Sequence, residues 1–157
     1  MAWTLLLAAG QGNRLASATG GLAKQFLDWK GAPLYWESAL VFSRCARVEG
    51  LVFVFPEACI DEERERVAGL MRNASLGIPW KVVAGGALRQ DSVRNGLSAL
   101  PDDCMEVLIH DAARPFVSPV LVNRILDGLH GEASGECVAA CIPGIPVVDT
   151  IKVMDEE

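Results

Sequence analysis

The sequence has little of what metal clusters and disulfide frameworks require. Only two histidines, His110 and His130, occur in 157 residues, so a histidine-based metal cluster is not expected. The five cysteines form no C-x-x-C pair, and their odd number leaves one over. This usage indicates free thiols in a reducing compartment rather than disulfides or a zinc site. We therefore expect a cytoplasmic protein.

Clustered positive charge and long apolar runs are also missing. The net charge is −6, and no segment concentrates Lys and Arg, which argues against a nucleic-acid surface. No apolar run approaches the length of a membrane span. The apolar residues after Met1 lack a basic start and lead into a glycine-rich turn, so they predict a strand rather than a signal peptide. We expect small-molecule partners, with no nucleic acid and no membrane.

Short apolar runs alternate with longer amphipathic stretches along the chain. The runs cover residues 3–8, 51–55, 80–83, 107–110 and 137–142. This alternation predicts βαβ units on a mostly parallel sheet, an α/β fold of one domain. Helices are expected to start at Pro33 and at Asp61, to cover residues 90–100, and to run from Ser118-Pro119 to about Leu129.

Residues 143–157 differ in character from the rest, because they hold too many breakers for a core helix. We expect a nucleotide-binding domain over residues 1–142 and an arm that leaves it over residues 143–157. In open α/β sheets, ligands bind at the edge where parallel strands end. Four loops are expected at that edge: residues 9–24, 84–90, 111–115 and 142–150.

The first of these loops carries Gly10, Gly12, Arg14 and Lys24, a set suited to cradling a polyphosphate. The spacing is neither that of a P-loop nor that of a dinucleotide fingerprint, since Leu15 stands where the third glycine would be. From this segment alone, an ordinary strand-to-helix turn is an equal alternative.

The second and third loops add further candidates. Ser92 follows a glycine pair and is expected to bind a base, a ribose or its own backbone. Asp111 ends a predicted strand and is a candidate ligand for Mg²⁺, while the small Ala112 leaves room for a ligand. The alternative for Asp111 is a turn cap that pairs with Arg114.

Together these loops suit attack of a phosphate monoester on the α-phosphate of a Mg²⁺-bound nucleoside triphosphate. The second pKa of a monoester is about 6, so the nucleophile is already a dianion at neutral pH and needs no general base. The reaction needs in-line positioning and neutralisation of charge. Arg14, Lys24 and a metal on Asp111 would supply them.

Six segments resemble, in order and spacing, the motifs of the 2-C-methyl-D-erythritol 4-phosphate cytidylyltransferase family. They are residues 7–15 (LAAGQGNRL), 24–26 (KQF), 31–33 (GAP), 85–93 (GGALRQDSV), 110–116 (HDAARPF) and 149–152 (DTIK). The resemblance implies a three-layer, Rossmann-like nucleotidyltransferase sheet with a projecting dimerisation arm. It also implies a homodimer and transfer of CMP from CTP to methylerythritol phosphate, in the non-mevalonate route to isoprenoids.

The resemblance assigns a role to each matching position. Arg14 and Lys24 would stabilise the transition state, and Asp111 would hold Mg²⁺. The remaining binding positions are Ala8, Ala9, Gly10 and Gly12 at the CTP phosphates, Gly86, Ala87 and Ser92 at the cytidine, Ala112 and Arg114 beside them, and Thr150 at the substrate of a partner subunit.

Two departures from the family pattern stand out. Ala23 replaces the proline that usually precedes the lysine, and the chain ends inside the dimerisation arm, before a second metal-contacting acid and a substrate-binding lysine. We therefore expect this chain to bind CTP and to turn over poorly. The alternatives are a ribitol-phosphate cytidylyltransferase and a CTP-binding fragment without activity.

Overall fold

A computed structural model describes residues 1–10, 22–131 and 138–146 of the chain. The chain divides into two compact units, Met1–Pro119 and Val120–Glu157. The boundary expected after residue 142 falls inside the second unit, and the arm, described only over residues 143–146, stays a prediction.

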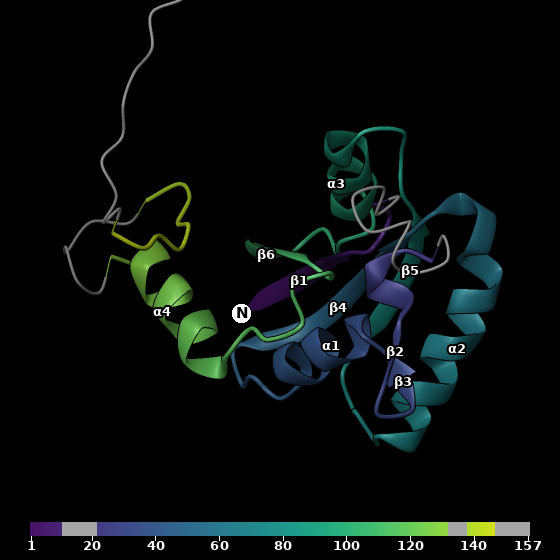
Figure 1. Cartoon of the computed structure of the whole chain (residues 1–157). Helices are drawn as coiled ribbons and strands as arrows, with labels where there is room; N and C mark the ends of the chain where they lie inside the picture. The colour runs from purple at the N-terminus through teal and green to yellow at the C-terminus, as the bar shows by residue number, and fades with distance from the viewer. Residues whose placement is uncertain (11–21, 132–137, 147–157) are drawn as a thin grey trace, which may run out of the picture. The chain divides into compact units, whose positions relative to one another are not determined.

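A parallel four-stranded sheet forms the centre of the first unit (Figure 1). Its strands lie in the order β5 (Trp80–Ala84), β4 (Val48–Phe55), β1 (Ala2–Leu7) and β6 (Glu106–Asp111). All three pairings are parallel, as expected for strands joined by helical crossovers. Four of the five predicted strands are thereby confirmed.

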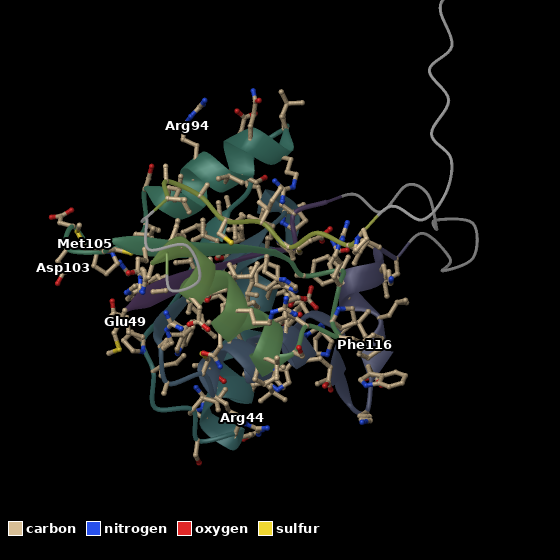
Figure 2. All side chains as sticks on the ribbon, turned by 90° about the vertical axis from the view of Figure 1, so that its left-hand side faces the viewer. Arg44, Glu49, Arg94, Asp103, Met105 and Phe116 are labelled. Carbon is tan, nitrogen blue, oxygen red and sulfur yellow. The ribbon has the colours of Figure 1, made fainter. Side chains whose placement is uncertain are left out.

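Helices cover both faces of this sheet. Its central strands are apolar on both sides, so both faces must be covered to bury them. Leu5, Val52 and Val54 face helix α3 (Arg89–Leu97), where Gly96 lets the helix approach the sheet. Helix α1 (Tyr35–Ser43) packs on the other face. In Figure 2, Arg94 of α3 and Arg44 after α1 accordingly project from opposite sides of the sheet. The three-layer α/β architecture is confirmed for this unit.

Helix α2 (Ile60–Asn73) follows a short 3₁₀ turn, η2 (Glu57–Cys59), and starts with three acids as the sequence predicts. One of them, Glu63, is buried and accepts a 2.7 Å hydrogen bond from the hydroxyl of Tyr35 on α1. Arg66 pairs with the same carboxylate at 3.1 Å. Burial, reinforced by Glu63, raises the pKa of Tyr35 far above its usual range. This contact ties α2 to the face that α1 covers.

A hairpin precedes α1 and shifts its start. Strands β2 (Asp28–Trp29) and β3 (Ala32–Pro33) are joined by two residues with positive φ, Lys30 at 56° and Gly31 at 82°, as a type I′ turn requires. Pro33 therefore ends a strand instead of starting the helix, and the predicted helix start is wrong by two residues. The short 3₁₀ turn η1 (Lys24–Phe26) leads into the hairpin.

The second unit contains most of helix α4 (Pro119–Leu129), at the bounds predicted from its Ser-Pro start. Residues 138–142 form no strand, so the fifth predicted strand is wrong over that range. Within the described residues, no helix is both long enough and apolar enough to cross a membrane. The cysteines that the structure describes, at 45, 59, 104 and 141, form no disulfide with one another.

Candidate functional site

Three segments meet at the carboxyl edge of the sheet. The strand register places Leu7 opposite both Val54 and Asp111, so β1 and β6 end at the same level. The amide of Ala112 donates to the carbonyl of Leu7 at 3.0 Å, which extends this pairing past the strand ends. Figure 2 shows Phe116, which follows β6, on the opposite side from Asp103 and Met105, which precede it.

The loop after β5 lies directly against the loop after β1. Gly85 donates its amide to the carbonyl of Phe55 at 2.7 Å. A Cβ atom at Gly85 would overlap the Cβ of Ala9 and would lie 2.9 Å from the Ser92 hydroxyl. Only glycine permits this approach, so the first two candidate loops share one site.

The glycine turn after β1 is held by Gln25, a residue to which the sequence assigned no role. The Gln25 amide nitrogen donates to the carbonyls of Ala8 at 2.8 Å and Gly10 at 2.7 Å, and the side chain is buried. Both amide hydrogens are thereby used. Gln25 lies beside Lys24 in the chain, so it fixes the turn next to the candidate catalytic lysine.

The predicted phosphate-binding residues are only partly described. Ala8 is buried and donates its amide to the Val54 carbonyl, whereas Gly10 is exposed at the end of the described segment. Lys24 is partly exposed at the start of η1. Gly12, Arg14 and Thr150 lie outside the described residues, so their roles stay predictions.

The second loop is organised by the first turn of α3. The Ser92 hydroxyl accepts from the Gly86 amide at 3.1 Å and donates to the Leu88 carbonyl at 3.3 Å. The Asp91 carboxylate accepts from the Leu88 amide at 3.1 Å. Ser92 thus binds its own backbone, one of the three options that the sequence left open. Gly86 and Ala87 are exposed and stay predicted cytidine contacts.

The third loop is a tight turn centred on Asp111. Its carboxylate accepts from the Ala113 amide at 3.1 Å, and its carbonyl accepts from the Arg114 amide at 2.9 Å. The Arg114 guanidinium lies 3.7 Å from the other carboxylate oxygen. The turn cap and the pairing with Arg114 are therefore present, while the small Ala112 is buried beneath them.

This carboxylate remains suited to Mg²⁺. The Asp111 side chain is 45% exposed, and an exposed ion pair at 3.7 Å is weak. Within the described ranges no group of three or more His, Cys, Asp or Glu side chains could hold a metal by itself. Mg²⁺ commonly binds one or two carboxylates together with substrate phosphates and water. The donor set fits a metal that arrives with its nucleotide.

His110 precedes Asp111 and points to the opposite face of β6. Its ring lies 5.1 Å from that of Phe42, and its Nε2 lies 3.0 Å from the Arg114 carbonyl and 3.1 Å from the Ser38 hydroxyl. Burial lowers the pKa of His110, against a smaller opposite effect of its bond to Arg114. Burial therefore favours the neutral imidazole.

Comparisons with known proteins match the chain to one family. The family model for 2-C-methyl-D-erythritol 4-phosphate cytidylyltransferase matches residues 2–157. The chain is 52% identical over 154 residues to a bifunctional enzyme IspD/IspF from Oleidesulfovibrio alaskensis, covering 98% of this chain and 37% of the relative. It is 37% identical to a 2-C-methyl-D-erythritol 4-phosphate cytidylyltransferase from Clostridium botulinum, covering 98% of this chain and 61% of the relative.

A solved structure shares the fold. The chain is similar to the 4-diphosphocytidyl-2C-methyl-D-erythritol synthase of Anaerococcus prevotii, with a TM-score of 0.64 and 22% identity. The match covers 82% of this chain and 50% of that one. The chain therefore spans less than two thirds of the length of the relatives it matches.

Proposed function

The chain belongs to the 2-C-methyl-D-erythritol 4-phosphate cytidylyltransferase family, and from this premise we propose that it binds CTP and transfers CMP to methylerythritol phosphate. The observation that carries the proposal is the convergence of three loops at one sheet edge. Gly85 abuts Ala9, and Ala112 bonds to Leu7, so a glycine turn, a second glycine loop and a carboxylate share one site.

The chemistry is an in-line displacement at phosphorus. An oxygen of the methylerythritol phosphate dianion forms a bond to the α-phosphorus of CTP, and the bond from that phosphorus to the bridging oxygen breaks. Pyrophosphate leaves with the electron pair. No general base is required, because the monoester is already a dianion at neutral pH. This agrees with the role of His110, whose Nε2 is engaged by a backbone carbonyl.

Each residue would have a role that follows from its position in the site. Backbone groups of Ala9 and Gly10 would meet the phosphates, and the ammonium group of Lys24 would stabilise charge that develops on the oxygens in flight. Arg14 would act with Lys24. Asp111 would hold Mg²⁺, which when bound neutralises phosphate charge and orients the leaving group. The cytidine would lie over Gly86 and Ala87.

We further propose a homodimer through the arm of residues 143–157, in which Thr150 contacts the substrate bound to the partner subunit. A cytoplasmic location is part of this proposal, and the reduced state of the described cysteines supports it. Sedimentation of the purified chain measures its mass in solution. A monomer at all concentrations would contradict the dimer.

Nucleotide selectivity tests the central proposal. Calorimetric titration with CTP, UTP, ATP and GTP, each with and without Mg²⁺, should show tightest binding for CTP and a gain in affinity with the metal. Equal affinities for the four nucleotides would overturn the cytidylyl assignment. Incubation with CTP and either methylerythritol phosphate or ribitol phosphate then identifies the acceptor, and faster turnover with ribitol phosphate would reassign it.

A further inference from the structure

The turn that carries Asp111 is anchored at its far end by a contact across the sheet edge. Arg114 ends the turn, and its side chain is 82% exposed, so the guanidinium does not fix the backbone. Its carbonyl instead receives the Nε2–H of His110 at 3.0 Å. Since a carbonyl oxygen only accepts, the ring proton sits on Nε2.

Helix α1 holds the imidazole in place. The Ser38 side chain is fully buried, and its hydroxyl oxygen lies 3.1 Å from Nε2 and 3.5 Å from the Arg114 carbonyl. The Phe42 ring lies against the imidazole at 5.1 Å. Side chains from one turn of α1 thus restrict His110 from two sides.

We infer that His110 is a positioning residue that acts through the Asp111 turn, keeping the carboxylate where a metal–nucleotide complex can use it. His110 precedes Asp111 in the chain and Arg114 follows it, so the bond closes the backbone loop of residues 110–114 that carries the carboxylate. The inference rests on the proposed function. It assigns His110 no proton transfer, because its Nε2 proton is used by Arg114.

Two substitutions separate positioning from simple packing. His110→Gln places an amide N–H close to the position of Nε2, so it can still donate to the carbonyl. His110→Phe keeps a ring against Phe42 but has no donor. We expect H110F to weaken Mg²⁺ binding about tenfold at saturating CTP, within the range measured for groups that orient metal ligands. H110Q should remain within about threefold of the parent chain.

The readout is a Mg²⁺ titration in the presence of CTP, with CTP affinity in EDTA as the second measurement. A purely structural defect lowers both, whereas positioning lowers the metal affinity alone. Ser38→Ala keeps the imidazole but removes one of the contacts that hold it. It should weaken Mg²⁺ binding less than H110F and more than H110Q, and it serves where H110F does not fold. Ser43→Ala is the matched control, because the Ser43 hydroxyl donates to Leu40 within α1.

Asp111→Asn in the same titration distinguishes a failure of the proposed function from a failure of the inference about His110. A weaker metal affinity for D111N together with normal affinity for H110F and S38A overturns the inference and leaves the proposed function standing. Equal weakening in H110F and H110Q also overturns it. An unchanged affinity for D111N overturns the metal role of Asp111, and the inference with it.

Discussion

Gly85 and Ala9 approach so closely that no side chain fits between them, although they follow different strands. Gly85→Ala should therefore push the two loops apart. Overpacking of this kind costs about 1–3 kcal/mol, and CTP binding should weaken with it. Thermal unfolding and CTP calorimetry are the measurements.

Gly77→Ala is the matched control for that substitution. A Cβ at Gly77 meets nothing within 4 Å, and the residue is exposed. The unfolding midpoint and the CTP affinity of G77A should match those of the parent chain. Equal effects of G85A and G77A would show that the close approach to Ala9 is unimportant.

Gln25→Glu should disrupt the glycine turn while changing almost no volume. A carboxylate cannot donate to the carbonyls of Ala8 and Gly10, and the negative charge would face both oxygens. The loss of buried donors costs about 1–3 kcal/mol of unfolding free energy. We also expect CTP affinity to fall, as measured by calorimetry. Asn73→Asp makes the same chemical change at the exposed C-terminal end of α2. It should leave CTP affinity unaltered and cost at most about 1 kcal/mol of unfolding free energy, because a negative charge there opposes the helix dipole.

Lys24→Ala should affect the rate more than binding, because the proposed role of the ammonium group is in the transition state. Removing one such contact lowers turnover about 100- to 1000-fold. The measurement is pyrophosphate release at saturating CTP and acceptor. Lys30→Ala removes a lysine from the hairpin tip, where it lies 5.6 Å from the Trp29 ring. A K24A rate within tenfold of K30A would make Lys24 a surface cation.

Cys59 should react slowly with iodoacetamide at pH 8. Burial, together with Glu63 and Glu62, raises the pKa of Cys59 above that of an ordinary thiol, and Arg66 opposes this only in part. Since the thiolate is the reactive form, the rate should still be rising at pH 9.

The same chain unfolded in urea is the control for Cys59, and site-resolved mass spectrometry follows the label. Because the fold disfavours the thiolate, this group's contribution to stability is complete below pH 9 and declines above it. If the rate of labelling of Cys59 had the same pH midpoint in the native and the unfolded chain, the raised pKa would be contradicted.

Patterns along the chain were sufficient to predict the sheet and the loops that end it. The central strands β1 and β4 are buried on both faces and appear in the sequence as short apolar runs. The edge strands β5 and β6 are more exposed but also carry such runs. The hairpin of residues 28–33 was not predicted, because its strands have two residues each and carry no periodicity. It displaced the expected helix start at Pro33.

The candidate site was predicted by residue type but not by its supports. Gln25 binds a carbonyl 17 positions away, and Ser38 meets His110 across 72 positions. Such contacts depend on how the chain folds back, and no local pattern encodes them. The motif around Lys24 places Gln25 near the candidate site. Only the structure shows that its buried amide binds the carbonyls of Ala8 and Gly10.

The pairing of β1 with β6 also bears on the order of folding. These neighbours come from opposite ends of the first unit, with β4, β5, α1, α2 and α3 between them in the sequence. Contacts of such separation carry a loop-closure cost and form slowly. The glycine turn leaves the ribosome early, yet its edge of the sheet is completed only when β6 arrives. We therefore expect the affinity for CTP to appear in the last phase of refolding, after the helical signal has returned.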